Sequence, residues 1–133
     1  MTFNSIGRHI SQTARVEVKS DMSPWLKGMQ GKKYIVPFSH GEGRFYASDK
    51  MVKELAANGQ IATQYVDFEG NVALDMPFNP NGSVYGIEGI TDASGQIYGR
   101  MGHPERYREG LMKNIPEIAF MDIFKNGVEW FKG

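Results

Sequence analysis

Apolar and charged positions alternate near the start of the chain. From Ala14 to Lys19 they take turns with a period of two, which predicts a half-buried β-strand. The stretch from Tyr34 to Phe38 is apolar without interruption, which is typical of a strand buried on both faces. We therefore expect residues 34–38 to form a central strand of a sheet.

A helix and two hairpins are expected next. Asp49 can cap a helix that runs to Asn58, because the apolar residues in this segment recur at helical spacing and Gly59 is a typical stop. The extended segments 61–66 and 72–74 flank a turn at 67–71, and the segments 85–91 and 96–101 flank a turn at 92–95. Both arrangements predict β-hairpins.

A final helix is expected to begin at Pro116, because proline is favoured at the first helical position. Its apolar residues form a broad face that we expect to belong to the core. They are Ile118, Phe120, Met121, Phe124, Val128, Trp130 and Phe131.

Composition narrows the class of protein. A chain of 133 residues with 41% hydrophobic content can bury one core, so we expect a single domain. Fifteen basic and fifteen acidic residues cancel, which argues against nucleic-acid or anionic membrane partners. No apolar stretch has the length of a membrane helix, and the opening is not a signal peptide, so we expect a cytoplasmic protein. The absence of cysteine excludes disulfides and cysteine-based metal sites.

Candidate chemistry centres on His103, Pro104 and Glu105. The proline fixes its own φ and favours an extended residue before it, so an imidazole and a carboxylate are held in one relative geometry. Such a pair suits a general base and the carboxylate that orients it. The same trio also fits an ordinary surface turn with a solvated carboxylate.

A second candidate is the glycine-rich turn from Ser39 to Gly43. It leaves the predicted strand through two glycines, so backbone amides can approach a ligand without an intervening Cβ. Amides of this kind can hold a carboxylate, although a turn without a ligand has the same sequence. The segment from Asn79 to Ser83 is equally open, since its asparagines and glycine fit either a tight turn or a loop near a pocket.

Several motifs in a fixed order carry a family resemblance. The segments 35–45, 60–67, 78–83 and 87–92 precede the histidine trio, and in this order they resemble the glutaminase domain of phosphoribosylformylglycinamidine synthase, a class I glutamine amidotransferase. The resemblance runs from about Phe3 to the last helix. It implies an α/β fold, the mixed-sheet C-terminal half of a flavodoxin-like class I glutamine amidotransferase domain.

The resemblance also implies roles for the site residues. His103 would be the general base and acid, and Glu105 would orient it. The backbone of Ser39, His40 and Gly41 would hold the α-amino-acid end of glutamine, and His40 would not be the base. Arg106 is assigned no catalytic role. A metal-dependent hydrolase is a poor alternative, because the remaining histidines show no ligand spacing.

The sequence departs from the family at the nucleophile, because it contains no cysteine. We therefore expect residues 1–133 to be the C-terminal portion of a glutaminase domain, without the nucleophile-bearing part and inactive alone. The whole enzyme would use glutamine to convert formylglycinamide ribonucleotide to its amidine, with ATP and magnesium bound by synthetase domains outside this chain. Expected partners are glutamine, those domains and a second copy of the chain. The alternative is a stand-alone, non-catalytic binding module on the same scaffold.

Overall fold

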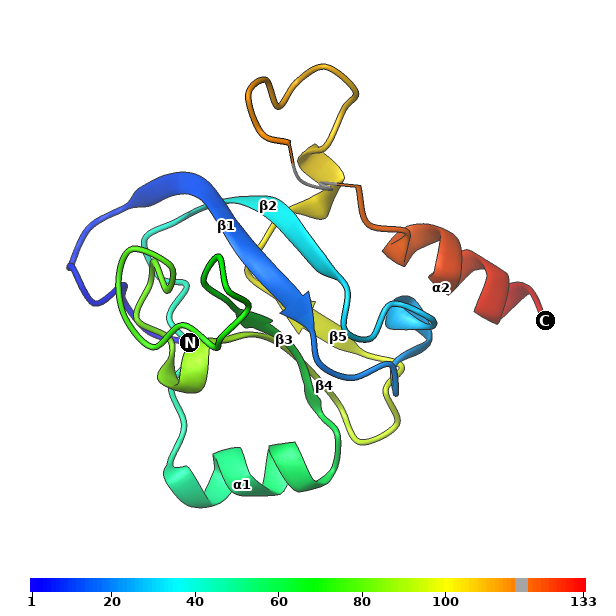
Figure 1. Ribbon diagram of the computed structural model, residues 1–133. Helices are drawn as coiled ribbons and strands as arrows, with labels where there is room; N and C mark the ends of the chain where they lie inside the picture. Colours follow the sequence, from blue (N-terminus) through cyan, green and yellow to red (C-terminus); the bar gives the residue numbers. More distant parts are fainter. Residues whose placement is uncertain (117–119) are drawn as a thin grey trace.

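Five strands and two α-helices make up the fold in the computed structural model, which describes residues 1–116 and 120–133. Figure 1 shows the strands grouped together, with the helices at separate places around them. The strands are β1 (Ile10–Val18), β2 (Lys33–His40), β3 (Ile61–Tyr65), β4 (Ile87–Thr91) and β5 (Tyr98–Arg100), and the helices are α1 (Asp49–Ala57) and α2 (Ile123–Lys132). The expected α/β class, with few helices, is confirmed, but the described strands form an antiparallel sheet rather than the expected mixed one.

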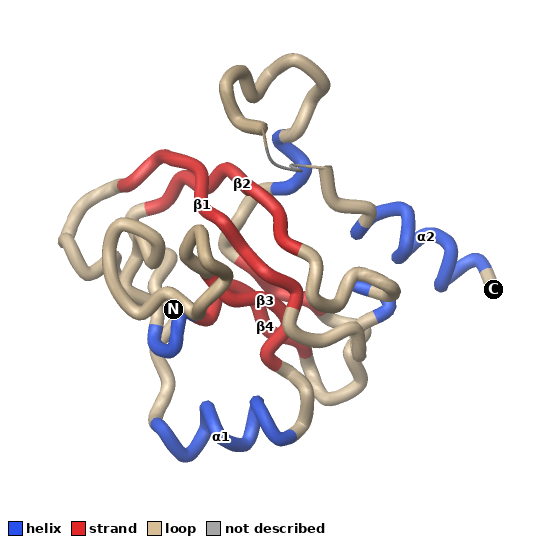
Figure 2. The backbone as a smooth tube through the Cα atoms, in the orientation of Figure 1, coloured by secondary structure: helices blue, strands red, loops and turns tan. Residues whose placement is uncertain are grey.

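The strands form one sheet in the order β2-β1-β3-β4-β5, and every neighbouring pair is antiparallel. Figure 2 shows the strands in red. Strand β1 follows the predicted alternation, since Ala14, Val16 and Val18 are buried while the residues between them are more exposed. Across the β1–β2 ladder Ala14 faces Val36 and Val16 faces Tyr34, so side chains of both strands meet in the core.

The position of β2 corrects one expectation. The apolar run at 34–38 does form a strand, but the strand lies at an edge of the described sheet rather than at its centre. Pro37 agrees with an edge position, because proline has no N–H to give to a ladder. The carbonyl oxygen of Pro37 instead accepts a hydrogen bond from the His103 amide at 2.7 Å. The sheet therefore curls, bringing the segment that follows β5 against β2.

Both expected hairpins are present, with shorter strands than predicted. In the first, β3 is followed by a single bridge between Val66 and Val72 rather than by a second strand. In the second, β4 and β5 pair with Gly89 opposite Arg100. The three residues before β4 form a 3₁₀ turn in which Tyr85 has a φ of 52°, so the extended backbone begins only at Ile87.

Helix α1 begins and ends close to the predicted residues. Its N-cap is Ser48 rather than Asp49, because the Ser48 hydroxyl accepts a hydrogen bond from the Met51 amide at 3.3 Å. Val52 is its buried residue. No helix of the described residues is long and apolar enough to cross a membrane.

Helix α2 differs most from expectation. It begins at Ile123 rather than at Pro116, and residues 117–119, including Ile118 of the predicted face, lie outside the described residues. The helix packs through Gly127 on the ring of Trp25, and Met121 and Ile123 are buried. The prediction that the whole apolar face belongs to the core was wrong, because several of its side chains are more than half exposed. They are Phe120, Phe124, Val128, Trp130 and Phe131.

Candidate functional site

His103 and Glu105 face each other as the sequence predicted. Nδ1 of His103 lies 2.7 Å from Oε1 of Glu105, within hydrogen-bonding distance. Both side chains are partly exposed to solvent. Burial raises the pKa of Glu105, but hydrogen bonds from its own backbone amide and from His103 outweigh this and leave the pKa below its ordinary value. Glu105 is therefore a carboxylate at neutral pH and can orient the imidazole.

The backbone before the imidazole is fixed by three successive amides. The Met101 amide donates to the carbonyl oxygen of Glu88 at 3.2 Å, and the Gly102 amide donates to Oε1 of Glu88 at 2.6 Å. The His103 amide donates to the carbonyl oxygen of Pro37 at 2.7 Å. The segment that carries the imidazole is thus tied to β4 on one side and to β2 on the other.

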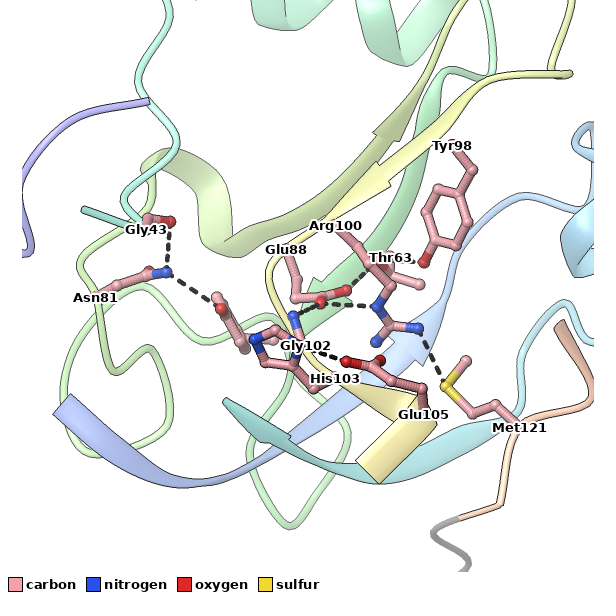
Figure 3. Close-up of polar contacts among 11 residues, drawn as sticks. Gly43, Thr63, Asn81, Glu88, Tyr98, Arg100, Gly102, His103, Glu105 and Met121 are labelled. Atoms are coloured by element: carbon pink, nitrogen blue, oxygen red, sulfur yellow. Dashed lines mark hydrogen bonds and ion pairs between the residues drawn. The ribbon is translucent and has the colours of Figure 1, made fainter. Parts of the chain in front are cut away.

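The Glu88 carboxylate is the centre of a buried polar cluster that Figure 3 shows beside the His103–Glu105 pair. Its Oε1 lies 3.1 Å from Nε of Arg100, and its Oε2 accepts a short hydrogen bond from the Thr63 hydroxyl. Nη1 of Arg100 lies 3.2 Å from the sulfur of Met121. Sequence reasoning missed this cluster, although a charged residue at an apolar position of β4 is a signal that could have revealed it.

The glycine-rich turn lies at the end of β2. The Ser39 hydroxyl is 3.0 Å from Nε2 of His9, and the Gly41 carbonyl accepts from the Asn4 amide at 2.9 Å. The Asn4 side chain donates to the His40 carbonyl at 2.7 Å and lies 3.2 Å from Nδ1 of the His40 ring. Buried Asn4 therefore holds the turn in shape, a role that the sequence did not reveal.

The His40 ring is built into the fold. It packs on Phe38 with ring centroids 5.1 Å apart, and it covers Gly43 so closely that a Cβ there would overlap the ring. Burial lowers the pKa of His40 below its ordinary value, a backbone hydrogen bond opposes this, and His103 and His9 lower it further. The His103 amide donates to the Pro37 carbonyl, three residues before His40, so the glycine-rich turn and the His103–Glu105 pair lie at the same end of the sheet, as predicted.

The segment from Asn79 to Ser83 is a buried polar turn. Nδ2 of Asn79 donates to the Ser83 carbonyl at 2.8 Å, and Nδ2 of Asn81 donates to the Gly43 carbonyl at 2.8 Å and to the Tyr65 hydroxyl at 3.2 Å. The Asn81–Gly43 contact is drawn in Figure 3. The segment is therefore a tight turn that supports the glycine-rich turn through Asn81. Asn79, Gly82 and Ser83 of the same segment also line a surface hollow, so both interpretations fit the structure.

A surface hollow of about 440 Å³ adjoins the imidazole. Its walls include His103 and Glu105 together with the aromatic residues Trp25, Tyr98 and Phe124. Within residues 1–116 and 120–133, no group of three or more potential ligand side chains converges in a way that could hold a metal ion. The chemistry that the described site offers is thus that of an imidazole, a carboxylate and backbone amides.

A solved structure places this fold in a class. A chain in the structure of PurLQS from Thermotoga maritima superposes with a TM-score of 0.69, covering 98% of this chain and 51% of that chain at 24% sequence identity. At that identity the likeness establishes the fold, an α/β domain with a curled sheet.

Sequence comparison identifies the family. The chain belongs to the CobB/CobQ-like glutamine amidotransferase domain family, whose model matches residues 1–131. It is similar to the phosphoribosylformylglycinamidine synthase subunit PurQ of Methanococcus maripaludis, with 44% identity over 96% of this chain and 53% of the relative. The subunit PurQ of a Synechocystis species is 40% identical over 83% of this chain and 49% of the relative. The chain thus spans about half the length of these relatives.

Proposed function

We propose that this chain supplies the base and the glutamine-binding turn of a glutamine-hydrolysing site. One observation carries the proposal: Nδ1 of His103 lies 2.7 Å from the Glu105 carboxylate, and the His103 amide is hydrogen-bonded to β2, the strand that ends in the glycine-rich turn. With Nδ1 engaged by Glu105, Nε2 is the ring nitrogen left to exchange a proton with a reacting group.

The reaction requires a thiol, which these 133 residues do not contain. In the proposed mechanism the thiol comes from polypeptide other than these residues and transfers its proton to Nε2 of His103. The thiolate attacks the side-chain amide carbon of glutamine, and His103 returns the proton to the nitrogen as ammonia departs. Water then hydrolyses the γ-glutamyl thioester to glutamate and restores the thiol. Glu105 stabilises the imidazolium that forms between the two proton transfers.

Glutamine recognition is assigned to the turn at the end of β2. Ser39, His40 and Gly41 would hold the α-amino-acid end of glutamine through their backbone. The packing of His40 on Phe38 supports a role for the backbone rather than for the ring, because a ring fixed in the fold is poorly placed to transfer protons. Asn4 and Asn81, which brace the turn, would keep its backbone in place before glutamine binds.

The ammonia would serve the conversion of formylglycinamide ribonucleotide to formylglycinamidine ribonucleotide in purine biosynthesis. The names of the relatives support this assignment, since they are subunits of phosphoribosylformylglycinamidine synthase. The proposed partners are glutamine and the synthetase domains, and we place ATP and magnesium on those domains, outside this chain. Association of two copies of the chain stays a prediction, which analytical ultracentrifugation would test.

A chimera tests the proposal. The chain replaces the matching part of the Methanococcus maripaludis relative, whose remaining half is kept, and ammonia release from glutamine is measured with and without the synthetase. We expect the chimera to release ammonia and the isolated chain to give only the background rate. Glu105→Gln in the chimera should lower the rate on the order of 10²–10⁴-fold.

Two results would contradict the proposal. Glutamine hydrolysis by the isolated chain would show that the nucleophile is not a thiol. A folded chimera that binds the synthetase but releases no ammonia would favour the alternative, a non-catalytic binding module.

A further inference from the structure

We propose that Glu88 is a positioning residue for His103, acting through the Gly102 amide. The inference rests on the proposed function in one respect only, namely that His103 is the base. Glu88 lies on β4, and Figure 3 shows it beside the His103–Glu105 pair; its side chain is fully buried, so it would not touch glutamine directly.

Both carboxylate oxygens of Glu88 are held by other residues. The side chain is fully buried, with Oε1 engaged by Gly102 and Arg100 and Oε2 by Thr63. A buried carboxylate is costly unless it is paired and hydrogen-bonded, so these contacts leave it little freedom to move. Glu88 can therefore serve as a fixed reference point for the backbone that it holds.

The backbone at Gly102 lies very close to Val36 and Glu88. A Cβ at this residue would lie 2.7 Å from Cγ2 of Val36 and 2.9 Å from Oε1 of Glu88. Glycine thus allows the chain to pass directly over the carboxylate, where its amide donates at 2.6 Å. The next residue is His103, so a displacement of the Gly102 amide would also displace the imidazole.

The length of the Glu88 side chain and its charge serve different contacts. The Arg100 guanidinium is nearly buried and pairs with Glu88, which explains the charge of residue 88. The position of Gly102, however, requires only an acceptor oxygen at the right distance. A glutamine at 88 supplies such an oxygen without the charge, while an aspartate keeps the charge but withdraws the oxygen by about one carbon–carbon bond, ~1.5 Å.

Two variants of the 133-residue chain use this difference. Glu88→Asp keeps the charge pair and loses the reach. Glu88→Gln combined with Arg100→Met keeps the reach and leaves no unpaired buried charge. Glu17→Gln is the matched control, because it removes a sheet carboxylate that pairs with Lys19 and Lys33 away from the site. Each folded variant is studied by ¹⁵N-histidine NMR, with the His103 signals assigned by His103→Gln, and by amide exchange at Gly102.

A positioning role predicts a specific pattern. Glu88→Asp should speed exchange at the Gly102 amide by about tenfold and remove the ring signature of His103 hydrogen-bonded to Glu105. The double variant and Glu17→Gln should keep both. Unchanged exchange and ring signals in Glu88→Asp, or their loss in the folded double variant, would overturn the proposal.

If Glu88→Asp does not fold, Thr63→Val decides, because it frees Oε2 of Glu88 with a small change in volume. Faster exchange at Gly102 is then expected, and unchanged exchange overturns the proposal. These spectra do not depend on glutamine hydrolysis, so they can fail while the chimera is active, or succeed while it is not. In an active chimera, Glu88→Asp should lower kcat by about 100-fold with little change in KM.

Discussion

Individual buried residues determine how the site is held. The clearest case is Gly102, where the backbone lies against both Val36 and Glu88. Gly99, on β5, is its matched counterpart, because a Cβ there would meet no atom within 4 Å. The two glycines differ in the space around them rather than in an unusual φ.

Replacing these glycines by alanine should therefore have different outcomes. Gly102→Ala is expected to destabilise the fold by about 1–3 kcal/mol, because the added methyl group forces the backbone away from β2 and β4. Gly99→Ala should leave the free energy of unfolding within about 0.5 kcal/mol of the parent. Urea denaturation measures both. Equal effects of the two substitutions would show that the backbone at Gly102 has more room than the structure indicates.

Tyr98 makes the stability of the fold depend on pH in the alkaline range. Burial raises the pKa of Tyr98 to about 12, with Arg100 opposing the shift and Glu88 supporting it. The folded-state pKa is thus above the unfolded value of about 10. This contribution to stability is complete below pH ~10 and is lost as the pH rises toward ~12, because the unfolded phenol ionises first.

The corresponding variant is Tyr98→Phe, with exposed Tyr46→Phe as the control. The parent and the control should lose stability between pH ~10 and ~12, whereas Tyr98→Phe should lose less over the same range. Urea denaturation at several pH values measures this slope. A slope in Tyr98→Phe as steep as that of the parent would refute the assignment.

Among the secondary-structure elements, α1 depends on its cap more than on its packing. Its residues are mostly exposed apart from Val52, so the Ser48 hydroxyl that accepts from Met51 matters for where it begins. Ser48→Ala should cost about 1 kcal/mol of unfolding free energy, and Ser48→Asp should restore most of it. An unchanged denaturation midpoint in Ser48→Ala would mean that Asp49 takes over as cap.

The strands show which elements the sequence can predict. The alternation of apolar and charged residues predicted strand β1, because one face of the strand is buried and the other is more exposed to solvent. The place of β2 in the sheet could not be predicted in this way, because an apolar run looks the same at the centre and at a covered edge. Pro37 contained the missing information, since a residue without an N–H suits an edge.

Helix α2 shows the opposite difficulty. Its apolar spacing correctly indicated a helix, but the extent of burial depends on what packs against it. Among the described residues the main contact of this helix is the turn around Trp25 and Lys27, where Nδ2 of Asn126 donates to the Lys27 carbonyl at 3.1 Å. Periodicity alone cannot reveal that the remaining apolar side chains, such as Phe131, stay exposed.

At the scale of the whole molecule, the sheet curls and brings distant parts of the chain to one end. The His103–Glu105 contact could be predicted because the two residues are neighbours in sequence. The contacts of Asn4 with His40 and of Glu88 with Thr63 could not, because each joins segments that only the fold brings together. The resemblance to a family suggested candidate site residues, and the structure shows which buried residues hold those candidates in place.

The role of His103 as the base is tested by comparing two imidazoles, those of His103 and His9, in the chimera that carries this chain. Both lie at the same end of the sheet, but His9 is exposed, with Nε2 lying 3.0 Å from the Ser39 hydroxyl. The rate of ammonia release from glutamine is measured for His103→Ala and for His9→Gln. With His103 as the base, we expect a loss of about 10²–10⁴-fold for His103→Ala and a nearly unchanged rate for His9→Gln. Full activity in a folded His103→Ala chimera would contradict this role of His103.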